Sequence, residues 1–179
     1  MKPWALSILI ILLIAPHSAV AADELGGWLG KAVSFYSEGS YELALLYVNK
    51  SLDIDPGHPD AWNLRGYIES DLGRYREAAD SFNRSLAIDP SDPYIWYSQG
   101  FALHSHGEYD EAVACYDRAL ELNSSQLDFW RARGLALYRA GRYEEALGSY
   151  NEALVIDPSQ GDVWRQKGLA LSSMERYDE

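Results

Sequence analysis

Four side chains that could bind a metal ion alternate along one short stretch of the sequence, as His104, His106, Glu108 and Asp110. Imidazole and carboxylate groups bind transition metals, and alternating residues of a loop can face one ion. Two of the intervening residues, Gly107 and Tyr109, recur elsewhere in the chain at a fixed spacing and therefore belong to a structural pattern. An ordinary polar turn explains the stretch, and we predict neither a metal site nor a bound cofactor.

The sequence offers no convergent set of acid, base and nucleophile. Cys115 is the only cysteine, so no intramolecular disulfide can form, and no basic neighbour is present to activate its thiol. The acidic pairs Asp110-Glu111 and Glu144-Glu145 open predicted helices, where acids interact favourably with the helix dipole. Phosphate-binding glycine loops and the short motifs of hydrolases and zinc proteases are missing from the sequence. We predict that the chain is not an enzyme.

The net charge of the chain indicates which classes of partner it can bind. The 179 residues include 27 acids and 15 Lys and Arg, for a formal net charge of −12. Such a surface repels the phosphates of nucleic acids and anionic lipid headgroups. We therefore expect a protein or peptide partner that is neutral or basic, and no nucleic acid.

Residues 1–22 have the composition of a targeting signal. Lys2 precedes an apolar run from Trp4 to Ala15, and Ala19-Val20-Ala21 places small residues where a signal peptidase cleaves. The apolar run is shorter than the roughly 20 residues that cross a bilayer. We predict a cleaved signal peptide and a secreted, periplasmic or cell-surface protein. An uncleaved membrane anchor is the alternative, and only then would the protein contact a membrane.

The rest of the chain repeats one pattern every 34 residues. Tryptophan recurs at this spacing, and so do a tyrosine, a glycine and an alanine; the tryptophans are Trp28, Trp62, Trp96, Trp130 and Trp164. The pattern divides the domain of residues 23–179 into units 25–58, 59–92, 93–126 and 127–160 and a partial unit 161–179. A period of this length is typical of a stack of helical repeats.

Each unit contains the signals for two helices. In the fourth unit Trp130, Gly134 and Leu137 share one face of a first helix, which Gly141 ends because glycine accepts a left-handed conformation. A second helix follows from Tyr143 and stops before a proline. One such pair cannot bury its apolar face alone, so neighbouring pairs must stack.

These units closely resemble the tetratricopeptide repeat, whose signature places Trp, Gly, Tyr, Ala and Pro at these positions. Glu69 and Ser124 depart from the signature, as do polar residues such as Arg65 and Gln99 where the family has leucine. The resemblance covers the whole chain after the leader. It implies an all-α, right-handed superhelical solenoid of antiparallel helix pairs, of the exported prokaryotic type.

The resemblance also implies a concave groove lined by the first helix of each unit. The positions that correspond to the family's groove hold the candidate binding residues Tyr36, Asn63, Tyr67, Tyr94, Tyr97, Phe101, His104, Arg131, Tyr138, Arg139 and Arg165. For Tyr67 and Phe101, packing onto neighbouring repeats is an equal alternative, whereas Tyr94, Tyr97 and Tyr138 are expected to face the groove. The pair of residues with which one subgroup of the family binds chaperone C-termini is absent.

The resemblance implies a protein–protein interaction scaffold outside the cytoplasm that binds a partner segment in this groove. The alternative is an interaction domain of a longer exported or membrane-anchored protein, whose activity lies in a further C-terminal part. The fifth unit stops at the opening of a second helix, where Trp164 would lack its usual neighbour. We therefore expect that further repeats, another domain or a partner covers this end, unless the helix of residues 162–174 itself serves as a cap.

Overall fold

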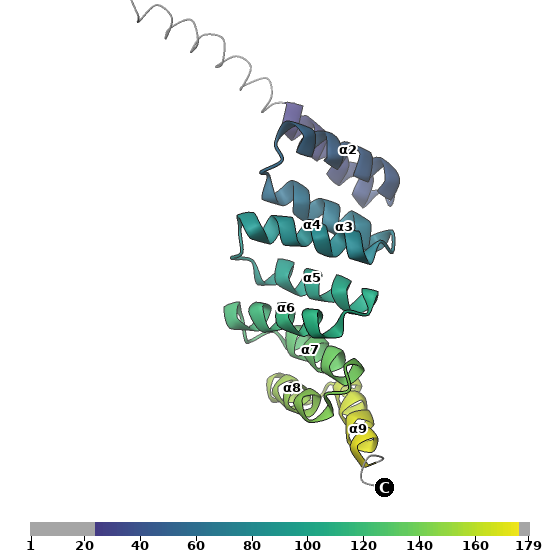
Figure 1. Cartoon of the computed structure of the whole chain (residues 1–179), viewed down its shortest axis with the longest axis vertical. Helices are drawn as coiled ribbons and strands as arrows, with labels where there is room; N and C mark the ends of the chain where they lie inside the picture. The colour runs from purple at the N-terminus through teal and green to yellow at the C-terminus, as the bar shows by residue number, and fades with distance from the viewer. Residues whose placement is uncertain (1–23, 176–179) are drawn as a thin grey trace, which may run out of the picture.

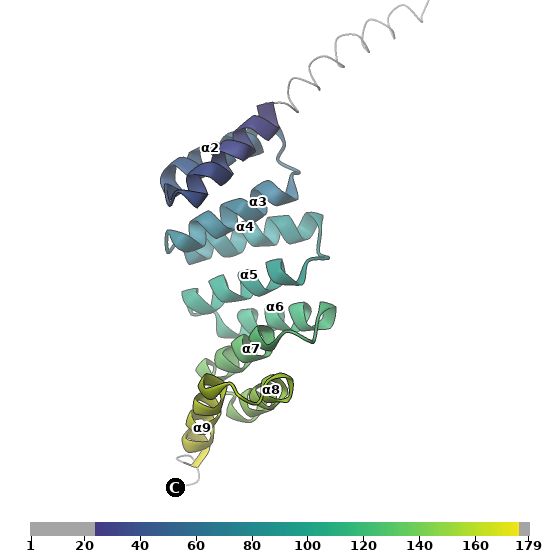
Figure 2. The same cartoon turned by 180° about the vertical axis from the view of Figure 1, so that it is seen from behind.

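The computed structural model of the chain describes residues 24–175, and within this range the chain is helical with short connecting turns. A first helix covers residues 24–37. It is followed by α2 (Tyr41–Ile54), α3 (Pro59–Asp71), α4 (Tyr75–Ile88), α5 (Pro93–His106), α6 (Tyr109–Leu122), α7 (Leu127–Arg139), α8 (Tyr143–Ile156) and α9 (Gly161–Glu175). The helices stack along the long axis, and their direction turns steadily from α2 to the steep α9 (Figures 1 and 2). The predicted all-α superhelical array is confirmed.

Two of the predictions concern residues outside the described range. The predicted leader of residues 1–22 and the end of the partial fifth unit, including Tyr177, lie beyond them. Within residues 24–175, no helix combines the length and the apolar character that a bilayer crossing requires.

Repeated turns set the helix boundaries. Gly39, Gly73, Gly107 and Gly141 each adopt a positive φ between 73° and 97°. The residue after each glycine donates its N–H to a carbonyl five residues back, as from Arg142 to Leu137 at 2.9 Å. This is the Schellman arrangement that closes a helix C-terminus. Between units an Asp or Asn side chain accepts a backbone N–H two residues on, as Asp157 does from Ser159 at 2.9 Å.

Within a unit, a glycine on the first helix lets an aromatic ring of the second helix lie against the backbone. A Cβ on Gly134 would lie 2.5 Å from the ring of Tyr150, which is fully buried. Gly66 lies against Phe82 and Gly100 against Tyr116 in the same way. These close approaches allow three large rings to fill the centre of the stack.

The contacts between neighbouring units show that the helices form two rows, one inner and one outer. The helices α3, α5, α7 and α9 each contact the next member of this series. The helices α2, α4, α6 and α8 make no close backbone contact with one another, although each packs against its neighbours in sequence. The first row therefore follows the inside of the curve and the second row the outside, as the predicted concave groove requires.

Most of the tryptophans that recur every 34 residues lie close to the surface. Trp62 is buried with 8% of its surface exposed, but Trp96 and Trp130 are half-buried and Trp164 is 50% exposed. The indole N–H of each ring donates to a backbone carbonyl six residues earlier, in the loop between units, at 2.8–2.9 Å. The tryptophan rings therefore stabilise the loops between units as well as the core. Trp130 uses the carbonyl of Ser124, so the missing proline costs no hydrogen bond.

The other departure from the repeat pattern, Glu69, is also accommodated. Its carboxylate is buried and accepts hydrogen bonds from Arg65 and Ser81. The polar residues that replace the family's leucine have comparable partners: Arg133 contacts Asp117 and Ser149, and Gln99 accepts from the thiol of Cys115 at 3.4 Å. Polar bridges between the two helices of a unit and to the preceding unit therefore occupy positions that leucine fills in the family.

Candidate partner-binding groove

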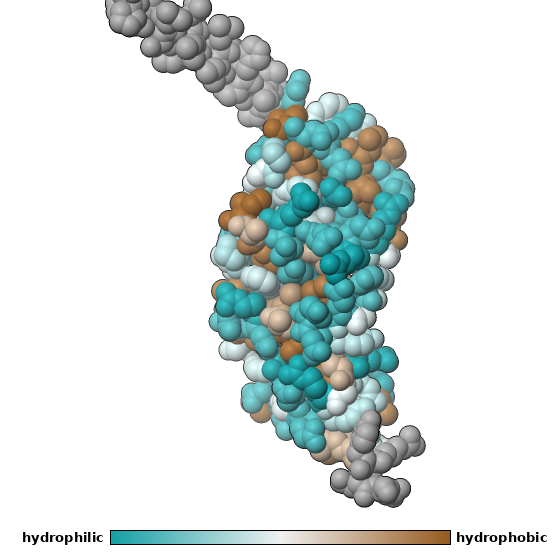
Figure 3. Space-filling view, in the orientation of Figure 1, coloured by the Kyte–Doolittle hydropathy of each residue, from teal (hydrophilic) through white to brown (hydrophobic). Residues whose placement is uncertain are grey.

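All eleven predicted groove residues lie on the inner row of helices, which includes the helix of residues 24–37. The inner row is hollowed at two places, between α3 and α5 and between α7 and α9. The view of Figure 3 shows a mostly hydrophilic surface on which apolar side chains form only small separate patches. Six of the eleven predicted groove residues line these two inner hollows.

The first hollow, here called the aromatic cavity, has a volume of about 270 Å³. It is lined by Tyr67, Ser70, Asp71, Phe82, Tyr97, Ser98 and Phe101. The hydroxyl of Ser98 donates to that of Tyr67 at 3.2 Å, and the ring of Phe101 stays 47% exposed. Both residues line this cavity and also contact a neighbouring unit, Tyr67 through Ser98 and Phe101 edge-on with Tyr75 at 6.5 Å, and Phe101 keeps an apolar surface exposed.

The second hollow, here called the arginine cavity, has a volume of about 260 Å³. It is lined by Leu135, Tyr138, Arg139, Tyr150, Arg165, Gln166 and Leu169. Three of these residues, Tyr138, Arg139 and Arg165, were predicted to bind a partner. The cavity joins them to a buried tyrosine and a glutamine that the sequence analysis did not include.

Two buried polar atoms at the arginine cavity have no hydrogen-bond partner in the part of the chain that the structure describes. They are the Tyr150 hydroxyl and the Gln166 side-chain carbonyl. Burial raises the pKa of Tyr150, so its hydroxyl stays protonated and can donate. Arg165 lies 3.6 Å from Asp162, whereas Arg139 forms no ion pair with any side chain of residues 24–174. Because buried polar groups are nearly always satisfied, these atoms mark a place where a ligand could bind.

Two of the predicted groove tyrosines also pack onto a neighbouring unit. The Tyr97 ring stacks on Phe129 with centroids 5.1 Å apart, and burial raises the pKa of its hydroxyl. Tyr94 meets the same Phe129 edge-on at 5.4 Å but remains 50% exposed. The expectation that Tyr97 simply faces the groove was therefore incomplete, because the ring belongs partly to the interface between units.

The remaining predicted residues lie along the groove outside the two cavities. Tyr36 is half-buried and hydrogen-bonds to Asp71, which together with burial raises the pKa of its hydroxyl. Asn63 is half-buried, and its side-chain carbonyl has no partner. Arg131 donates to Asp128 at 2.7 Å. Burial and the nearby Arg139 lower the pKa of His104.

The side chains that could have carried chemistry do not converge. Glu108 pairs with Arg76 and Asp110 with Arg142, while His104 meets the ring of Tyr109. Within residues 24–175, no three His, Cys, Asp or Glu side chains are grouped to hold a metal ion. Burial and the nearby Glu111 raise the pKa of the Cys115 thiol to about 12, so the thiol is protonated at neutral pH.

A stack of antiparallel helix pairs with an open, aromatic inner face defines a helical-repeat scaffold for protein–protein interaction. The chain belongs to the tetratricopeptide repeat family, whose sequence model matches residues 29–93 and 97–161.

Solved structures share this fold. The crystal structure of MamA protein superposes with a TM-score of 0.83 at 21% identity, over 88% of this chain and 86% of that chain. YrrB, described as a tetratricopeptide-repeat protein with an unusual peptide-binding site, gives a TM-score of 0.76 at 24% identity, over 83% and 76% of the two chains.

A curated relative matches a shorter stretch. The uncharacterized protein MJ0572 of Methanocaldococcus jannaschii is 39% identical over 52 residues, which are 29% of this chain and 60% of that protein. The match thus spans about 60% of the length of this relative.

Proposed function

We propose that the protein is an interaction scaffold outside the cytoplasm that binds an extended segment of a partner protein along its inner face. The observation that carries the proposal is the pair of exposed aromatic rings, Tyr94 and Phe101, beside the open aromatic cavity on the inner row of helices. Exposed aromatic side chains in a groove are typical anchors of protein interfaces. The peptide-binding description of YrrB, a protein of the same fold, supports the same use of this surface.

The groove assignment can be tested with peptides selected from a random-sequence display library on the full chain. Replacing Tyr94 and Phe101 by alanine should weaken the selected peptides by about tenfold or more, because exposed aromatic anchors dominate interface energies. Thermal stability should change little, since both rings are about half exposed. Tyr97 is a poorer probe, because its half-buried ring stacks on Phe129, whereas Tyr94 meets Phe129 only edge-on and is 50% exposed.

A matched pair on the outer helices provides the control. Ile88 on α4 and Val155 on α8 are also exposed apolar residues, and alanine at both positions should leave peptide binding unchanged. Equal loss from the inner and outer pairs, or the failure to select any peptide, would show that the inner face is not a binding groove.

The location outside the cytoplasm rests on the composition of residues 1–22. We expect the mature chain to begin at Ala22 or Asp23 in secreted or periplasmic material. Mass spectrometry of the N-terminus measures this directly. An intact Met1 in a membrane fraction would support the anchored alternative, and a chain that stays in the cytoplasm would exclude both.

A further inference from the structure

We propose that the arginine cavity binds one carboxylate, the side chain of an Asp or Glu in the partner segment. This inference rests on the proposed function and specifies what one part of the groove recognises. The cavity is formed by the end of α7, the buried ring of Tyr150 on α8 and the first half of α9.

The first observation is the unsatisfied hydroxyl of Tyr150. The residue lines the cavity although its ring is fully buried, and its hydroxyl has no hydrogen-bond partner among the described residues. Phe82 fills the corresponding place two units earlier and packs against its glycine in the same way, so the ring needs no hydroxyl to fill this space. Leaving a buried hydroxyl unpaired costs free energy, and a ligand acceptor would recover that cost.

The second observation is the local charge. Arg165 and the neighbouring Arg131 each have an aspartate close by, whereas Arg139 has no ion-pair partner among the side chains described, those of residues 24–174. The Arg139 guanidinium also lies close to both Tyr150 and His104: it partly offsets the burial that raises the pKa of Tyr150 and adds to the burial that lowers the pKa of His104. One positive charge is therefore left unbalanced at this cavity in a chain whose net charge is −12.

These two observations define the chemistry of the occupant. A carboxylate accepts hydrogen bonds from a guanidinium and from a hydroxyl, and bonds to a charged group are the stronger kind. Leu135 and Leu169 form apolar walls beside these donors and can contact the methylene stem of an acidic side chain. A polyanion would neutralise the single free charge but would then meet the acidic surface around it.

The test uses peptides selected on the full chain and their amide variants. We expect the tightest peptides to share one acidic side chain, and changing it from Glu to Gln should weaken binding by about tenfold. Arg139→Met should weaken binding of the unchanged peptide by a similar factor. The two changes together should cost no more than either one alone, because both remove the same interaction.

Tyr150→Phe separates a binding role from a structural one. It should weaken the acidic peptide several-fold, leave the amide variant unaffected, and keep or raise the melting temperature, because an unpaired buried hydroxyl is removed. Arg142→Met is the control, since this arginine lies on the outer side and should not affect binding.

Three outcomes would overturn the inference. These are the absence of a shared acidic side chain, additive losses from Glu→Gln and Arg139→Met, and dependence on the peptide's free C-terminal carboxylate instead of a side chain. If Tyr94 and Phe101 still matter in such a case, the groove assignment stands and only the carboxylate site is wrong.

Discussion

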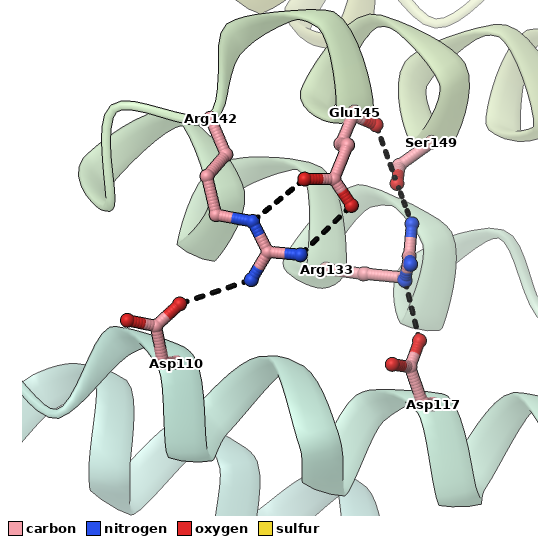
Figure 4. A network of polar contacts seen from close by, with 6 residues as sticks. All are labelled: Asp110, Asp117, Arg133, Arg142, Glu145 and Ser149. Atoms are coloured by element: carbon pink, nitrogen blue, oxygen red, sulfur yellow. Dashed lines mark hydrogen bonds and ion pairs between the residues drawn. The ribbon is translucent and has the colours of Figure 1, made fainter.

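Arg139 and Arg142 lie three residues apart at the junction of α7 and α8, but their guanidinium groups have opposite surroundings. Arg142 donates to Asp110 at 2.9 Å and to both oxygens of Glu145 at 2.7 and 2.8 Å (Figure 4). Within the described part of the chain, Arg139 pairs with no carboxylate and borders the arginine cavity. Arginine therefore joins neighbouring repeats on the outer side, through Arg142. On the inner side, the guanidinium N–H groups of Arg139 form no ion pair with the described carboxylates.

The ion pairs between successive outer helices recur at a fixed spacing, unlike the contacts between inner helices. Successive outer helices are joined by ion pairs between residues 32 positions apart: Arg74 with Glu42, Arg76 with Glu108, and Arg142 with Asp110. The signs are reversed in the middle pair. A unit placed next to the wrong neighbour would bring like charges together, so these pairs favour the correct order of stacking although each is exposed and weak.

The largest loss of stability is expected from a substitution inside one unit. Tyr150 is part of the core of that unit and also lines the arginine cavity. Gly134→Ala would place a methyl group 2.5 Å from this immobile ring. Overpacking of this kind costs about 1–3 kcal/mol, and displacing the ring should also weaken peptide binding. Urea unfolding of the full chain measures the loss of stability.

Gly168 is a matched control for this substitution, because it holds the same position one unit later. Among the described residues, a Cβ there meets nothing within 4 Å, so Gly168→Ala should stabilise α9 by up to about 1 kcal/mol through helix propensity. Equal responses at Gly134 and Gly168 would show that the close approach of ring and backbone does not limit the packing of the unit.

The fold could be predicted from the sequence because its defining contacts lie within one repeat. Gly141 must end α7 in a left-handed conformation, and Gly134 must admit the Tyr150 ring, whatever the neighbouring units do. The exposure of the tryptophans was less predictable. Whether Trp96 is covered depends on the side chains of the neighbouring helix and on the loop carbonyl to which its indole donates, and no helical period encodes either of these.

The sequence could predict which residues lie on the inner face, but not the contacts that these residues make there. The repeat register placed Arg139 and Arg165 on the inner row, because that assignment needs only the helix period. It could not show that Tyr97 stacks on Phe129, since that contact depends on the angle between successive units. Tyr150 was missed because it lies on a second helix at a core position. The available signal was the register itself, in which Phe82 fills the same place without a hydroxyl.

A smaller effect is expected at Arg133 on α7, whose side chain reaches both α6 and α8. Its side chain is 20% exposed and donates to Asp117 at 2.6 Å and to Ser149 at 2.7 Å (Figure 4). Arg133→Met should lower the free energy of unfolding by about 1–2 kcal/mol, because two charged hydrogen bonds between α6, α7 and α8 are lost. A thermal or urea melt would reveal this, and an unchanged midpoint would mean that water replaces both bonds at no cost.

The smallest effects on stability are expected at the two arginines of the opening comparison, and here the inner and outer roles separate most clearly. Arg142→Met removes exposed ion pairs and should cost well under about 1 kcal/mol, with the difference from the parent chain shrinking as salt is added. Arg139→Met removes no ion pair and relieves an unbalanced charge, so its stability should equal or slightly exceed that of the parent at every salt concentration. Melting temperatures of the parent and both variants, measured at low and high salt, test this directly. A salt-dependent loss at Arg139 would mean that this side chain already has a partner in the folded protein and is not free to bind a ligand.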